Sequence, residues 1–496
     1  MSQKYLPISK NGKDATEIDS GEDIPEDKVV MPRFLGLIQS ISFVLGLIIG
    51  TGIFLTPTGV LRGSSGSIGV SLIMWVVGAF HASTGAMCYT ELALYYRQSG
   101  GSYIFLRSVY GPALGFLKIW ISFFVVSPCS AAIQSIVIVN FLITPFAGEC
   151  GSVPQAGIKM GASCVILLAV IINSVSTRWT AKVQVILLFV KTGAVLAIIL
   201  MGAVKMIQGG SSNFEKPFQT SGEFDFSKLA SAFFSATFAY GGWNNISNIT
   251  EEVKKPDTTM VRAMFISFVS VAILYLMTNV AYLAVLTPEE MMSSNAVAAL
   301  FAVRVISKRW SFVIWMCVVC SAAGNLNGTT YTKSRAYFVT ARNGQFPFIL
   351  STIHITRKTP LAAIIVSVPI TVLVIWSGNV WSVIDFLVCF NQIMNILTMA
   401  TVPYLRWKKP ERKLSYKAPL WSPFVYIGFT LAAVLMSAYS NPLQIGITAA
   451  LICIALIFYV LNQQLNRSAR AQEKLKHVND FLQKLFFSVE QEMKTY

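Results

Sequence analysis

The fold is decided by one short run, Ile48-Ile49-Gly50-Thr51-Gly52-Ile53-Phe54, in the middle of an apolar stretch from about residue 35 to residue 61. Two glycines around a threonine weaken a helix here, because glycine in a helix interior costs about 1 kcal/mol relative to alanine. In a membrane, backbone groups freed by a break are tolerated only where they face a cavity or pack inside protein. The run therefore indicates either an interrupted helix at a midplane site or a close contact between helices, since Gly46 and Gly50 have GxxxG spacing.

The composition is that of a polytopic membrane protein. Of the 496 residues, 54% are hydrophobic and only 12% are charged, whereas soluble domains carry about 25% charged residues. The N-terminal segment is polar and lacks the apolar core of a signal peptide, so we expect no cleavable leader. The net charge of +16 lies mainly in short loops between apolar segments. It therefore indicates membrane topology and not nucleic-acid binding.

Apolar windows of about twenty residues, the length that crosses a bilayer, predict an all-α protein with twelve transmembrane helices. Loops rich in lysine and arginine alternate with poorer ones, which predicts cytoplasmic termini. We expect a disordered cytoplasmic tail over 1–33, a twelve-span domain over 34–463 and a cytoplasmic amphipathic helix within 464–496. The windows are 35–61, 67–91, 112–142, 158–175, 184–207, 228–250, 262–286, 309–338, 360–377, 380–403, 419–438 and 444–463.

The C-terminal segment repeats apolar residues at three- and four-residue intervals, which predicts one apolar stripe on a basic helix. Such a helix either rests on the inner leaflet or docks on the cytoplasmic loops of the protein itself. The stripe consists of Leu475, Val478, Leu482, Leu485 and Val489.

A second interruption favours the broken-helix interpretation of the first. The sixth window contains Phe238-Ala239-Tyr240-Gly241-Gly242-Trp243-Asn244-Asn245, again a glycine pair inside an apolar span. Two glycine-interrupted spans in corresponding positions are typical of inverted-repeat transporters with discontinuous helices. A broken helix offers amides at one new end and carbonyls at the other. The two ends suit the carboxylate and the ammonium of an amino-acid zwitterion.

Lys191 is the one lysine that we place deep in an apolar run, from Val183 to Leu200. A lysine at mid-bilayer costs about 2.5–3.5 kcal/mol on insertion scales, so we expect it to bridge carbonyls of the broken first span. The alternative is that its ammonium snorkels to an interface. Other polar residues in apolar spans are expected to form interhelical hydrogen bonds, with Asn391 also a candidate pocket residue. They are Asn325, Asn327, Lys333, Asn391, Gln392 and Asn395, while His81 is expected to be a core histidine.

The sequence lacks the catalytic motifs of common enzyme classes. The sequence has no P-loop, no HExxH and no nucleophile elbow, so we expect neither an enzyme nor a cofactor. The eight cysteines are scattered singly. Cys317 and Cys320 have CxxC spacing inside a span without zinc partners, and Cys150 alone lies in a polar loop.

Several runs together resemble the light subunits of the heteromeric amino-acid transporters, the L-type branch of the amino acid–polyamine–organocation superfamily. The resemblance extends from about Pro32 to Glu492 and implies a LeuT-like fold. In that fold twelve spans contain a five-plus-five inverted repeat with discontinuous helices 1 and 6. The runs that carry it are 50–61, 88–92, 99–101, 238–244, 250–252, 279–282, 334–335 and 342–344.

The resemblance also implies the roles of individual residues. Phe238 would be the gate that closes over substrate, and Lys191 would occupy the sodium position. Cys150 would form a disulfide with a single-span glycoprotein heavy subunit. The implied substrate-binding residues are Ile48, Gly50, Thr51, Gly52, Phe238, Ala239, Gly241 and Asn391.

These features predict a sodium-independent exchanger of neutral L-amino acids at the plasma membrane. Gly241 stands where family members with cationic substrates carry an acid, and Gln392 replaces a tryptophan of large-neutral transporters. Ser122 and Ser127 replace a glutamate and an arginine, which suggests that an ion pair has been removed. The alternatives are a partner-independent uniporter or proton-driven transporter of small or cationic amino acids, and a sensor that binds an amino acid without moving it.

Overall fold

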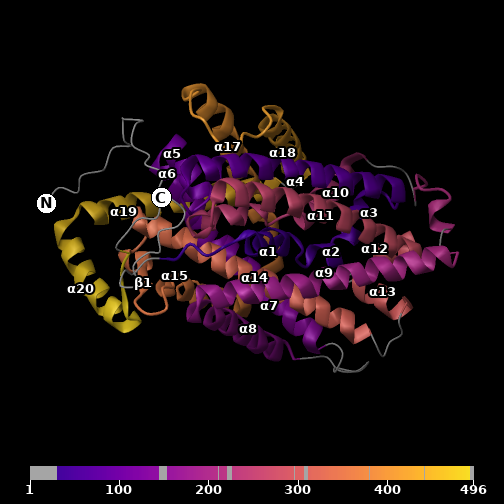
Figure 1. Ribbon diagram of the computed structural model, residues 1–496, viewed down its shortest axis with the longest axis horizontal. Helices are drawn as coiled ribbons and strands as arrows, with labels where there is room; N and C mark the ends of the chain where they lie inside the picture. Colours follow the sequence, from indigo (N-terminus) through magenta and orange to yellow (C-terminus); the bar gives the residue numbers. More distant parts are fainter. Residues whose placement is uncertain are drawn as a thin grey trace.

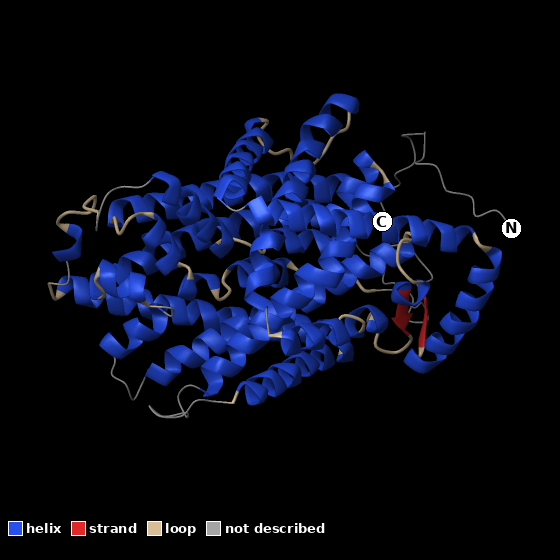
Figure 2. Ribbon diagram, turned by 180° about the vertical axis from the view of Figure 1, so that it is seen from behind, coloured by secondary structure: helices blue, strands red, loops and turns tan. Residues whose placement is uncertain are grey.

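The computed structural model describes residues 31–143, 154–209, 212–220, 226–294, 297–305, 311–378, 380–440 and 442–491. Within these ranges the protein is nearly all helical, with one small sheet of two strands (Figure 2). The long helices run side by side along one axis (Figure 1). Eight helices of the described chain are long and apolar enough to cross a membrane, and two shorter apolar helices cover 361–377 and 421–436.

The first half of the chain alternates long helices with short connecting ones. Its elements are α1 (Leu37–Ile48), α2 (Gly52–Leu55), α3 (Pro57–Gly63), α4 (Ile68–Tyr96), α5 (Ser102–Tyr110), α6 (Pro112–Ile121), the π-helix η1 (Ser122–Val126), α7 (Ser127–Ile143), α8 (Gln155–Val175), α9 (Thr177–Ile207), the 3₁₀-helix η2 (Ser212–Phe214), α10 (Phe226–Ala239) and the 3₁₀-helix η3 (Trp243–Glu252).

The second half contains the small sheet between its helices. Its elements are α11 (Pro256–Val285), α12 (Pro288–Ser293), α13 (Val297–Val305), α14 (Ser311–Arg342), the 3₁₀-helix η4 (Phe348–Ser351), β1 (Thr352–His354), α15 (Leu361–Ile365), α16 (Val368–Ser377), α17 (Val380–Lys408), α18 (Trp421–Ser440), α19 (Pro442–Arg467), α20 (Ala469–Phe486) and β2 (Ser488–Glu490).

The core surrounds α1, which packs against α9, α11, α14 and η3. Phe43, Val44 and Ile48 of α1 are buried, and Phe43 stacks on Tyr331 of α14. At one end of the molecule α3 packs against α12, whereas α15, α20 and the sheet lie at the opposite end (Figure 1). The lysine- and arginine-rich loops meet at the sheet end, so this is the end that the sequence predicts to face the cytoplasm.

The window 228–250 is interrupted at the glycine pair, as expected: α10 ends at Ala239 and the chain continues after a turn as the 3₁₀-helix η3. One expectation about local structure was wrong. Val489 does not belong to the apolar stripe of α20, because it lies in β2 and pairs with Ile353 of β1. The helix α20 itself is present and packs on the body through Leu482 and Phe486. The segment after it thus docks on the connection between α14 and α15 of the same chain.

Candidate functional site

The first break separates α1 from α2 in the middle of the bundle (Figure 1). α1 ends at Ile48, and Ile49 leaves helical geometry with ψ of 78°. The Gly50 N–H turns back to the Ile48 carbonyl at 2.7 Å, while the Thr51 N–H has no acceptor among the described residues. Helix resumes at Gly52. The glycine-threonine-glycine run therefore forms a real interruption with backbone groups outside the helical hydrogen-bond pattern, and not only a packing patch.

The second break follows α10. The Gly241 N–H bonds to the Phe238 carbonyl at 3.0 Å, which closes a tight turn. Gly242 has φ of 103°, a left-handed conformation that favours glycine. The ten residues from Trp243 to Glu252 then form η3. A 3₁₀-helix of this length is uncommon and often marks a functional segment.

The two breaks lie directly against each other. A Cβ atom on Gly52 would come within 2.9 Å of Ala239 Cα, and one on Gly242 within 2.7 Å of the Leu47 carbonyl oxygen. Both glycines are therefore required for this close approach. The resulting arrangement brings the predicted site residues Ile48, Gly52 and Ala239 to one place although they come from helices far apart in the chain.

Lys191 of α9 reaches the end of α1. Its side chain is fully buried, and Nζ donates to the carbonyls of Gly46 and of Ile49, the latter at 3.0 Å. Ser321 of α14 donates to the Ile49 and Gly50 carbonyls at 3.2 and 3.1 Å. Carbonyls freed by the break are thus held by an ammonium and a hydroxyl. The ammonium does not snorkel, because α9 and α14 enclose it.

Tyr275 of α11 links the two breaks and was missed in the sequence. Its Oη lies 2.8 Å from the Ile48 carbonyl oxygen and 3.2 Å from that of Ala239. Its ring packs between Trp75 and Tyr240. One hydroxyl proton is therefore shared between the ends of both interrupted helices. Nothing in the sequence around Tyr275 or Ser321 indicates that its hydroxyl bonds to a broken helix, because both lie in ordinary apolar spans.

The remaining predicted residues occupy different surroundings. The Phe238 side chain is 62% exposed, so in this conformation it does not cover the breaks. Asn391 lies on α17 and accepts a hydrogen bond from Lys118 Nζ at 2.9 Å. Cys150 lies outside the described residues. His81 is a core histidine, with Nε2 3.0 Å from Thr430 Oγ1.

The expectation of a single deep lysine was wrong. Lys118 lies on α6 inside the apolar window 112–142, and its side chain is only 8% exposed. Its hydrogen bond joins α6 to Asn391 of α17. The signal was present in the sequence, because a lysine six residues inside an apolar run is as costly as Lys191.

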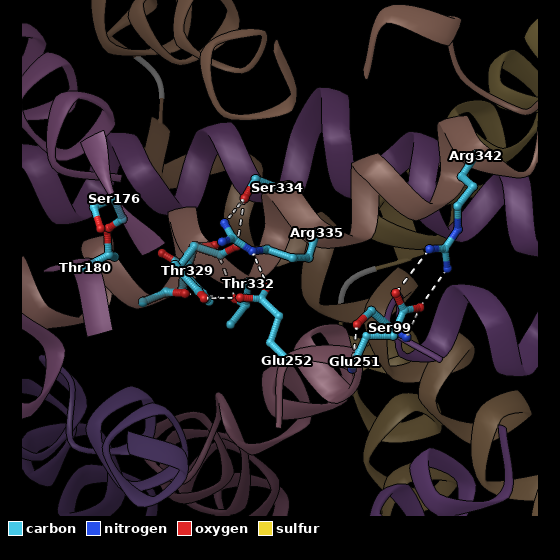
Figure 3. A network of polar contacts seen from close by, with 12 residues as sticks. Ser99, Ser176, Thr180, Glu251, Glu252, Thr329, Thr332, Ser334, Arg335 and Arg342 are labelled. Carbon is cyan, nitrogen blue, oxygen red and sulfur yellow. Dashed lines mark hydrogen bonds and ion pairs between the residues drawn. The ribbon is translucent and has the colours of Figure 1, made fainter. Parts of the chain in front are cut away.

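Ion pairs connect the second break to its neighbours on the side of the sheet end (Figure 3). Glu252, at the end of η3, accepts from Arg335 Nε at 2.7 Å and from Tyr331 Oη at 2.5 Å, and the side chains of Glu252 and Arg335 are fully buried. Its neighbour Glu251 pairs with Arg342 at 2.7 Å and accepts from the Ser99 N–H at 3.0 Å. The two carboxylates tie the second break to both α14 and the α4–α5 connection.

The comparisons with known proteins agree with this architecture. A family model described as amino acid permease matches residues 35–461. The human (Homo sapiens) cystine/glutamate transporter is 34% identical over 443 residues, 89% of this chain and 87% of that protein. The human large neutral amino acids transporter small subunit 2 is 33% identical over 466 residues, 92% of this chain and 84% of that protein. The mouse (Mus musculus) Asc-type amino acid transporter 1 is 33% identical over 441 residues, 88% and 82% of the two chains.

Proposed function

Because the chain belongs to the amino acid permease family, and is thus a multi-pass membrane transporter and not an enzyme, we propose that it is a sodium-independent exchanger of neutral L-amino acids. The main support for this function is that the two interrupted helices meet at Tyr275. The Thr51 N–H, which has no acceptor among the described residues, suits the carboxylate of an amino acid. The carbonyl oxygens at the breaks can each accept a further hydrogen bond, which suits its ammonium. The residues proposed to bind substrate are Ile48, Gly50, Thr51, Gly52, Phe238, Ala239, Gly241 and Asn391.

Sodium independence is supported by the position of Lys191. Its ammonium already occupies the space beside the Gly46 and Ile49 carbonyls where a cation would bind. A Cβ on Gly324 would lie 3.0 Å from Nζ, so this space is closely filled. We expect a fixed positive charge at this position to replace a coupling cation.

The membrane arrangement that we propose has twelve spans, both termini in the cytoplasm and a five-plus-five inverted repeat. Each of the twelve apolar windows falls on helix in the described chain. The first and sixth windows contain the two breaks, as a repeat of five spans would require. Transport would proceed by rocking of the first, second, sixth and seventh spans against the remainder, with Phe238 closing over substrate.

The partner that we propose is a single-span glycoprotein heavy subunit linked through Cys150 in the plasma membrane. Support comes from the name of a relative, the large neutral amino acids transporter small subunit 2. Cys150→Ser should remove a reducible high-mass band on a gel while transport is largely retained. A wild-type chain without such a band in cells would contradict the disulfide.

Uptake into proteoliposomes tests the exchange mechanism. The full chain is reconstituted with or without unlabelled amino acid inside, and uptake of a labelled neutral amino acid is measured in sodium and in choline buffer. We expect uptake only with internal substrate, equal in both buffers, and none for Phe238→Ala. Equal uptake into empty vesicles would indicate a uniporter, and saturable binding without uptake would indicate a sensor.

A further inference from the structure

Lys118 is a buried lysine on the apolar helix α6. Its Nζ donates to Asn391 Oδ1 at 2.9 Å and lies 6.0 Å from the ring centroid of Phe390, which is itself fully buried. Ser122, one turn further along the chain, brings a hydroxyl and no countercharge. A buried ammonium is costly unless an anion compensates it. The neutral amide of Asn391 compensates it only in part.

A second lysine increases this excess of positive charge. Lys333 lies on α14, which packs against α6, the helix of Lys118, and the two ammonium groups repel each other. Within the described part of the chain neither lysine forms an ion pair. The buried carboxylates of the described residues are already engaged, since Glu91, Glu251 and Glu252 pair with Arg406, Arg342 and Arg335. The two lysines are therefore available to an anion from outside the chain.

Lys333 stands at the cytoplasmic end of a polar stripe that begins at the first break. Asn325, Thr329 and Lys333 follow one another at four-residue intervals, so they share a face of α14. All three are partly exposed, whereas residues 326–328, 331–332 and 334–341 are buried. Asn325 Nδ2 lies 2.7 Å from the position of a Cβ on Gly50. At 1.5 Å per residue, Lys333 is about 12 Å further toward the cytoplasm.

We propose that Lys118 and Lys333, with Asn391, form an anion subsite on the inward half of the transport path that binds the side-chain carboxylate of an acidic amino acid. The inference rests on the proposed transport of amino acids and adds an acidic class to its substrates. A zwitterion has no net charge and gains little from two ammonium groups. A glutamate or aspartate carries one net negative charge, which the lysines attract and hold by charge-assisted hydrogen bonds.

The test compares internal glutamate with internal glutamine, which is nearly isosteric but neutral. Proteoliposomes with the full chain are loaded with one or the other, and uptake of the same labelled neutral amino acid is measured. We expect both to drive uptake in the wild type. Lys333→Gln should lower the glutamate-to-glutamine ratio of exchange about tenfold, equivalent to about 1.4 kcal/mol. Lys333→Arg should restore it, and the matched control Lys182→Gln, an exposed lysine of α9, should leave it unchanged.

The possible failures separate the two proposals. If neither amino acid drives uptake in the wild type, the proposed exchange fails. If glutamine drives uptake but glutamate does not, or if Lys333→Gln leaves the ratio unchanged, only the acidic subsite is overturned. Replacing chloride by gluconate tests whether the lysines bind an inorganic anion instead. If glutamine exchange depends on chloride in the wild type but not in Lys333→Gln, and glutamate exchange is the same in both proteins, the lysines bind an inorganic anion and the inference is wrong.

Discussion

The centre of the protein and its sheet end, which we propose to be the cytoplasmic end, hold their helices in opposite ways. At the centre, the carbonyls of the first break receive the ammonium of Lys191 and the hydroxyls of Ser321 and Tyr275, with no carboxylate among the described contacts. At the cytoplasmic end, Glu252 and Glu251 each meet an arginine. One helix, α14, supplies partners to both regions.

This difference teaches what each region can do. The breaks are held by backbone dipoles, two hydroxyls and one ammonium, so the site can accept a zwitterion without a competing carboxylate. Buried ion pairs are rigid, because separating them leaves a charge without a partner in a low dielectric. We therefore interpret the centre as the place of binding, and the cytoplasmic end as the clamp that fixes η3 to α14.

The largest effect is expected from breaking the clamp. Arg335→Met leaves the Glu252 carboxylate buried and without its cation, which costs about 3–5 kcal/mol of folding free energy. The expected result is a large fall in the melting temperature of the purified protein and little mature protein in the membrane. Thermal unfolding in detergent measures this directly.

An exposed ion pair of the same kind provides the control. The Arg97 and Asp257 side chains lie 3.1 Å apart and are 58% and 33% exposed. Because surface pairs contribute about 0–1 kcal/mol, Arg97→Met should hardly change the melting temperature. Equal losses for both variants would remove the distinction between a buried clamp and an ordinary surface pair.

A smaller loss of stability but a clear loss of transport is expected at the centre. Tyr275→Phe keeps the ring and removes the hydroxyl shared by Ile48 and Ala239, at a net cost of about 0.5–1.5 kcal/mol. We expect exchange to fall about tenfold while the protein remains folded, since the ends of the two broken helices are no longer coupled. Initial rates of exchange, normalised to reconstituted protein, measure the effect.

The same helix offers a matched control for the hydroxyl. Tyr282 is also fully buried in α11, but its Oη has no hydrogen-bond partner among the described residues. Tyr282→Phe should therefore leave both exchange and stability unchanged. If the two variants behave alike, the hydroxyl of Tyr275 has no special role and the centre is held by packing alone.

The sequence predicts where the helices and their breaks lie, but it does not predict which side chains contact the breaks. Apolar windows located the long helices, and the glycine runs at 50–52 and 241–242 located the breaks, because both are local properties. The donors that fill the breaks come from helices remote in sequence, so Tyr275 and Ser321 looked like ordinary span residues. The mostly polar run of η3, Trp243–Glu252, has no pattern that distinguishes 3₁₀-helix from α-helix. The three-residue strands β1 and β2 lie more than a hundred residues apart and have no periodicity to detect.

The smallest effect is expected at the edge of the cytoplasmic end, where β1 and β2 pair. The N–H groups of Thr356 and Arg357 lie 3.3 Å from His354 Nδ1, which accepts only while the imidazole is neutral. Partial burial and the nearby Arg357 lower the pKa of His354 below its usual 6.5. Because the unfolded segment binds the proton more readily than the folded one, the stabilisation by His354 is complete above about pH 6.5 and is lost as the pH falls below it. We expect faster amide hydrogen exchange at Ile355, whose N–H bonds to the Phe487 carbonyl, after correction for the intrinsic pH dependence. His354→Asn should abolish this change, and an unaltered pH response in that variant would assign it to another group.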